Sequence, residues 1–164
     1  MPLTKVQSQL LGTGAVLQVV QGVSASALAI SSSSYVDVSL SATITPTSTT
    51  SKILVLTNIS VASSNAGTGK YFRLVRGATA IGLGGSGNGG EAVSFGDYCP
   101  QHANSQASLA FNFLDTPATT GATTYKWTAR STGAVTFYVN RASGLGAGSY
   151  AEPLSTITLV EIAG

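Results

Sequence analysis

The stretch Tyr35-Val-Asp-Val-Ser-Leu-Ser-Ala-Thr-Ile-Thr45 decides the fold class of this 164-residue chain. Within it, every second residue is apolar: Val36, Val38, Leu40, Ala42 and Ile44. Because successive side chains of a strand point to opposite faces, this period of two predicts a half-buried β-strand. The next residue, Pro46, has no amide N–H to donate to a neighbouring strand, so we expect the strand to end there.

The same alternation recurs along the rest of the chain. It predicts further strands at residues 16–21, 53–61, 71–75, 79–81, 109–114, 125–130, 135–140 and 157–162. Gly, Pro, Ser and Thr turns separate most of these segments, and no helical crossover pattern lies between them. The sequence therefore predicts an all-β fold, an antiparallel β-sandwich that is jelly-roll-like and has about eight strands.

The alternation also predicts which side chains fill the sandwich. They are Val36, Val38, Leu40, Ile44, Ile53, Val55, Ile59, Val61, Leu109, Phe111, Phe113, Tyr125, Trp127, Val135, Phe137 and Val139. Tyr125 and Trp127 could instead form a platform on which a sugar stacks, but their alternation with Lys126 and Arg130 favours core packing. Better candidates for an exposed aromatic surface are Tyr71, Tyr98, Tyr138 and Tyr150.

Charge is scarce in this chain. Charged residues make up 9%, and eight Lys and Arg against six Asp and Glu give a formal net charge of +2. This composition excludes an acidic disordered chain, a coiled coil and a charge-rich helical bundle. The basic residues are too few and too scattered to predict nucleic-acid binding.

Residues 6–36 carry no formal charge and therefore need testing as a membrane segment. Gln and Ser residues interrupt this stretch, so it lacks the roughly 20 consecutive apolar residues of a membrane span. The N-terminus also lacks the charged and apolar regions of a secretory signal. We expect a soluble protein that is made in the cytoplasm and has no membrane partner.

The first fourteen residues differ in pattern from the remainder, which we interpret as a β-sandwich domain at 15–164. Thr4-Lys-Val-Gln7 fits a helix capping box, and Gly12 fits a helix end. A two-turn helix there would bring Val6, Leu10 and Leu11 onto one face. We interpret residues 1–14 as an arm that docks on a partner subunit; the alternative is a frayed leader.

Two patterns suggest ligand chemistry on first sight. Residues 82–87 and 85–90 both match G-x-G-x-x-G, but no helical pattern follows to meet a pyrophosphate, which favours a flexible surface loop. Cys99 and His102 have ligand-like spacing, yet structural zinc takes four ligands. A metal ion on a symmetry axis, held by His102 of several subunits, is the remaining alternative.

The sequence also lacks the residue combinations that common catalytic sites require. His102 is the only histidine, and Ser86 lacks the G-x-S-x-G context of a nucleophile elbow. A glycosidase needs two carboxylates at a defined separation, and most of the six acids occupy predicted strands or turns. We therefore expect a non-enzymatic protein with no catalytic residue, no cofactor and no resident metal.

Several segments resemble a group of tailed-phage virion proteins, which occur as tail-fibre tips and as short stand-alone virion proteins. The segments are residues 14–22, 34–37, 42–48, 51–55, 114–125 and 155–163, which include Ala42-Thr-Ile-Thr-Pro-Thr-Ser48 and Leu114-Asp-Thr-Pro-Ala-Thr-Thr-Gly121. The resemblance implies a small β-sandwich that assembles as a homotrimer and has no enzymatic activity. It also implies localisation to the virion after assembly in the host cytoplasm.

Two roles on the virion fit this resemblance. Since only residues 1–13 precede the module, a capsid decoration, or cement, subunit that binds the major capsid protein is favoured. The alternative is a tail-fibre or receptor-binding tip that attaches to the host surface through the loops at 82–106 and 141–152. Its possible contact residues are Tyr98, His102 and Tyr150.

Overall fold

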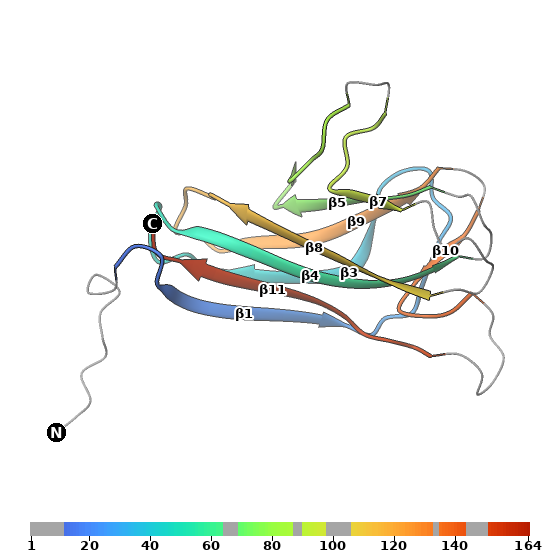
Figure 1. The fold of residues 1–164 in the computed structure, drawn as a ribbon, viewed down its shortest axis with the longest axis horizontal. Coiled ribbons are helices and arrows are strands. Elements are labelled where there is room, and N and C mark those ends of the chain that lie inside the picture. The colour runs from blue at the N-terminus through green and yellow to red at the C-terminus, as the bar shows by residue number, and fades with distance from the viewer. Residues whose placement is uncertain (1–11, 64–68, 87–89, 98–105, 133–134, 144–150) are drawn as a thin grey trace.

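The computed structural model describes residues 12–63, 69–86, 90–97, 106–132, 135–143 and 151–164 (Figure 1). These residues form eleven strands, which make two antiparallel sheets packed face to face. The prediction of an all-β antiparallel sandwich is confirmed. No helix among the described residues is long and apolar enough to cross a membrane.

The first sheet, sheet A, has β4 at its centre. Its strands are β1 (Val16–Ser24), β2 (Leu28–Ile30), β4 (Lys52–Ser63), β8 (Gln106–Asp115), β10 (Phe137–Val139) and β11 (Ser155–Ile162). Strand β8 pairs with β4 from Ile53 to Ala62, so β10 and β11 share the opposite edge of β4, end to end. Since β2 pairs with β10 and β1 pairs with β11, sheet A has four strand positions.

The second sheet, sheet B, repeats this arrangement around β5. Its strands are β3 (Val36–Ile44), β5 (Lys70–Arg76), β6 (Thr79–Ile81), β7 (Phe95–Asp97) and β9 (Thr123–Ser131). Strand β9 pairs with β5 from Lys70 to Arg76, so the short strands β6 and β7 share the other edge of β5. Sheet B therefore also has four strand positions.

The connectivity of these eight positions identifies the sandwich type. Numbered along the chain, the positions run 1-8-3-6 across sheet A and 2-7-4-5 across sheet B. This interleaved order, in which the first strand lies at an edge of sheet A and pairs with the last strand, is that of a jelly roll built from two Greek keys. The predicted jelly-roll-like architecture is thus confirmed, whereas the eleven strands exceed the predicted number of about eight, and β2 and β7 fall outside the predicted strands.

Side chains of both sheets meet in one core. The tightly buried members are Ile30, Val38, Leu40, Ala42, Ile44, Ile53, Val55, Ile59, Val61, Phe72, Leu74, Tyr125, Trp127, Ala129, Phe137, Val139, Ile157 and Leu159. Tyr125 and Trp127 are both 0% exposed, which confirms that they belong to the core.

Five residues that were predicted to lie in the core are less buried than expected: one is exposed and four are half-buried. Val36 is 37% exposed because it is the first residue of β3, an edge strand of sheet B, where fewer side chains cover it. Strand β3 also contains two extra residues relative to β9 between Asp37 and Ser41, with Ser39 at a positive φ of 57°, but this bulge leaves Val36 opposite the buried Ala129. Four others are only half-buried: Leu109, Phe111, Phe113 and Val135. The first three lie on β8, an edge strand of sheet A, where fewer neighbours cover them.

The predicted arm lies mostly outside the described residues, and Val6, Leu10 and Leu11 are among those not described. Just before β1, Gly14 donates its N–H to the Ala163 carbonyl, and the Ala163 N–H donates to the Ala15 carbonyl. The two described ends of the chain therefore continue the pairing of β1 with β11.

Candidate functional surfaces

The two sheets leave two outer faces with contrasting chemistry. On sheet A, the strand register aligns Val19, Val160, Leu54 and Leu114 across all four positions. We call these four residues the aliphatic row. Val19 is 59% exposed and Leu114 48% exposed, so the row is accessible at both ends.

Two rows on one side of the aliphatic row carry no charge, whereas the row on its other side contains the exposed Lys52, paired with Ile162. One row continues through Gln21, Thr158, Leu56 and Asn112, and the next through Val23, Thr156, Asn58 and Ala110. Val23 and Leu56 in these rows are also exposed. Covering the aliphatic row and these two neutral rows removes apolar area from water and requires no charge to be desolvated, which suits contact with another protein.

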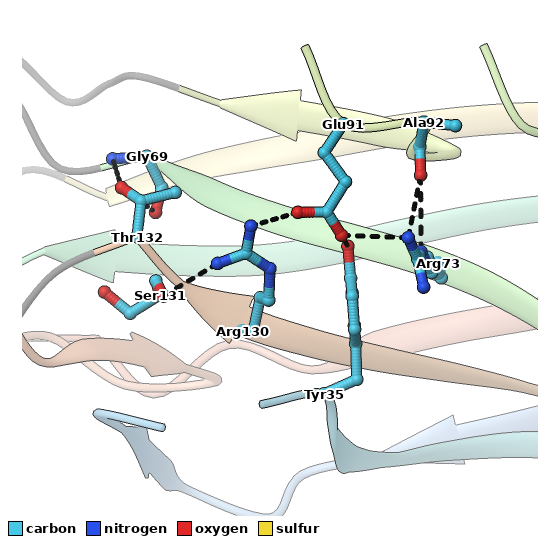
Figure 2. Close-up of polar contacts among 8 residues, drawn as sticks. All are labelled: Tyr35, Gly69, Arg73, Glu91, Ala92, Arg130, Ser131 and Thr132. Atoms are coloured by element: carbon cyan, nitrogen blue, oxygen red, sulfur yellow. Dashed lines mark hydrogen bonds and ion pairs between the residues drawn. The ribbon is translucent and has the colours of Figure 1, made fainter. Parts of the chain in front are cut away.

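The outer face of sheet B carries charged side chains gathered around Glu91. Figure 2 shows Arg73 of β5 and Arg130 of β9 on either side of the Glu91 carboxylate. Arg73 Nη2 lies 2.8 Å from Oε1, Arg130 Nη2 pairs with Oε2, and the Tyr35 hydroxyl donates to Oε1 at 2.7 Å. This cluster fixes the segment after the Gly-rich loop onto the face of sheet B.

Tyrosine rings also contact the side chains of the same two arginines. The Arg73 guanidinium lies 4.2 Å from the centre of the Tyr35 ring, and that of Arg130 lies 4.7 Å from the centre of the Tyr71 ring. The hydrogen bond from Arg130, working against burial, holds the pKa of Glu91 below its ordinary value. Burial and the hydrogen bond to Glu91 raise the pKa of Tyr35 to about 12. Glu91 is therefore charged and Tyr35 neutral at pH 7.

A shallow open pocket of about 390 Å³ adjoins this cluster. It is lined by Tyr35, Arg73, Val75, Gly77, Ala78, Ala80, Lys126 and Thr128. Three of these are cross-strand neighbours, since Val75 pairs with Lys126 on β9 and with Ala80 on β6. The lining thus combines three apolar residues, Val75, Ala78 and Ala80, which we call the floor of the pocket, with the two cationic side chains of Arg73 and Lys126.

Two further polar clusters are buried and serve the fold. Asp115 accepts two hydrogen bonds of 2.8 Å from Arg76 and one of 2.6 Å from the Tyr125 hydroxyl, which ties sheet A to sheet B. Glu161, 0% exposed, accepts hydrogen bonds from Gln18 and from Thr47. Burial alone would raise the pKa of Glu161, but the surrounding hydrogen bonds lower it overall.

The predicted contact residues Tyr98, His102 and Tyr150 lie outside the described residues, as does Cys99. Of the other tyrosines proposed for an aromatic surface, Tyr71 and Tyr138 are half-buried, each with an arginine over its ring. Within the described residues, no group of three or more His, Cys, Asp or Glu side chains could hold a metal ion.

Sequence reasoning missed both surfaces. Tyr71 was already a candidate for the exposed surface, and the outward position of Arg73 could have been read from the alternation in β5, but Glu91 follows a Gly-rich loop with no periodic pattern. The chain matches no protein-family model, and no curated protein is significantly similar to it in sequence.

Proposed function

We propose that this protein is a non-enzymatic structural subunit of a tailed-phage virion that works by packing against copies of itself and against other virion proteins. The observation that carries this proposal is the aliphatic row on sheet A, which crosses four strands and includes Val19 and Leu114 in exposed positions. The sequence resemblance to virion proteins and the jelly-roll fold, which viral capsid proteins share, add support by analogy.

A homotrimer is the proposed state of assembly, as the resemblance implies. Low charge favours it, because few charged groups lose water when copies associate. In the proposed assembly, the aliphatic row lies against a neighbouring copy.

On the particle, we propose the role of a capsid decoration subunit that binds the major capsid protein. To test this, the purified chain is incubated with expanded empty capsids of its phage, and separately with host cells. Co-sedimentation with capsids supports decoration. Binding to host cells without binding to capsids supports the second candidate, a receptor-binding tip, and binding to neither contradicts both.

Two variants test whether capsid binding in that assay depends on the aliphatic row. Leu114→Glu places a charge on the aliphatic row and should abolish co-sedimentation, because the glutamate would have to lose its water in the contact. Thr43→Glu on the outer face of β3 adds the same charge to the other sheet and should leave co-sedimentation intact. Equal loss in both variants would show that charge alone, and not this face, decides binding.

A further inference from the structure

The pocket on the outer face of sheet B combines an apolar floor with cationic side chains. Val75, Ala78 and Ala80 supply the floor, and Arg73 and Lys126 supply the charge. We propose that this pocket binds a carboxylated sugar, such as a uronic acid unit of an acidic polysaccharide. The proposal does not depend on the assembly role of sheet A.

The two cations are available to a carboxylate. Lys126 Nζ lies 3.3 Å from Asp37 Oδ2, but the two side chains are 36% and 50% exposed, so the ion pair is weak. Arg73 uses Nε and Nη2 for its hydrogen bonds to Ala92 and Glu91. Among the described contacts, its Nη1 donors have no protein acceptor, so they can serve a ligand.

Arg73 is also held in place before any ligand arrives. The Glu91 carboxylate, the Ala92 carbonyl and the Tyr35 ring contact it from separate directions (Figure 2). A side chain that is already ordered loses little conformational entropy on binding, which favours affinity. Glu91 thus acts as a positioning residue for the cation.

The remaining lining fits a sugar better than a small inorganic anion. The C–H face of a pyranose ring can pack on Val75, Ala78 and Ala80, and its hydroxyls can bond to Thr128. An ion such as sulfate would use the two cations and leave the floor unused. The pocket volume of about 390 Å³ accommodates one sugar unit and leaves its neighbours in solvent.

The test is an NMR titration of the full chain with D-glucuronate, with D-glucose as the neutral counterpart and sulfate as the simple anion. We expect glucuronate to shift the amide signals of Ala78, Ala80 and Thr128, and to bind at least roughly tenfold tighter than either control. Absence of shifts at tens of millimolar glucuronate, or equal binding of sulfate, overturns the proposal. Titration with an oligogalacturonate then shows whether a polymer source binds better than the free sugar acid.

Three variants sharpen the result. Lys126→Met should weaken glucuronate binding by roughly tenfold or more, because a charge-assisted hydrogen bond is lost. Ala80→Trp should block the floor while leaving the charge unchanged. The matched control, Lys52→Met, removes the same charge from sheet A and should leave affinity unchanged. A Lys52→Met effect equal to that of Lys126→Met would show that net charge alone attracts the sugar and would overturn the proposed site.

Discussion

Trp127 on β9 donates its indole N–H to Thr57 Oγ1 on β4, at 3.1 Å, across the interior between the two sheets. Both residues are buried. The indole ring also meets Phe111 edge-on, at 5.3 Å between ring centres, and Phe95 at 5.0 Å. One side chain therefore joins both sheets through a polar bond and through aromatic packing.

Trp127→Ala should lower the free energy of unfolding by about 3–5 kcal/mol, because it removes a large core side chain and leaves a cavity. Thr57→Val should cost about 1–3 kcal/mol, since it leaves the buried indole N–H without an acceptor. Urea denaturation measures both values. Thr156→Val, on the outer face of sheet A, is the control and should change stability by less than about 0.5 kcal/mol. An unchanged Trp127→Ala stability would refute the core assignment.

Asp115→Asn should lower the free energy of unfolding by about 1–3 kcal/mol, because it weakens the hydrogen bonds from Arg76 and Tyr125 at a buried site. Asp37→Asn is the matched control, because its pairing with Lys126 is solvent-exposed. That change should have little effect on stability. Equal effects of the two substitutions on the denaturation midpoint would contradict the proposed link between the sheets.

Gly22→Ala should destabilise the protein by about 1–3 kcal/mol or more, because the added Cβ would lie 2.0 Å from the Ser41 carbonyl oxygen of β3. The β1 and β3 backbones therefore need a glycine where they approach each other. Gly85→Ala is the control, since its added Cβ meets nothing within 4 Å. Thermal unfolding compares the two, and a Tm for Gly22→Ala equal to that of Gly85→Ala would show that the contact can relax.

Stability should fall as the pH drops through the acid range. The pKa of Glu91 is lowered in the folded protein, whereas an unfolded glutamate titrates near about 4.3. Its contribution is therefore complete above that pH and is lost as the pH falls toward the lower folded pKa. Glu161 contributes in the same direction.

Glu91→Gln should therefore make the decline of the denaturation midpoint between about pH 5 and pH 3 shallower, with the Glu161 contribution remaining. Glu152→Gln serves as the control for removing one exposed acid. If the slope is the same in wild type and Glu91→Gln, the cluster around Glu91 does not stabilise the folded state through its charge.

Most of the fold could be predicted because a half-buried strand has a local pattern. All nine predicted strands are present, and the alternation at 36–44 and 125–130 correctly indicated the buried side of β3 and β9 apart from Val36. Strands β2 and β7 have three residues each, which is too short for a period of two to be recognised in the sequence. The bulge at Ser39 depends on its pairing with β9, which no local pattern encodes.

The aliphatic row and the cluster around Glu91 could not be predicted, because neither has a local pattern in the sequence. The aliphatic row draws Val19, Leu54, Leu114 and Val160 from four strands far apart in sequence, and it exists only once strand order and register are fixed. The Glu91 cluster likewise depends on where a Gly-rich connection returns to sheet B. Such non-local placement follows from the jelly-roll connectivity, which brings remote segments side by side.

Multi-angle light scattering of the purified chain tests assembly through sheet A most directly. At micromolar concentration we expect a mass of about three times the 16.5 kDa chain, and a monomer for Leu114→Glu that is still folded by circular dichroism. Thr43→Glu should remain a trimer. A wild-type mass of 16.5 kDa, or a Leu114→Glu variant that assembles like wild type, would contradict the account.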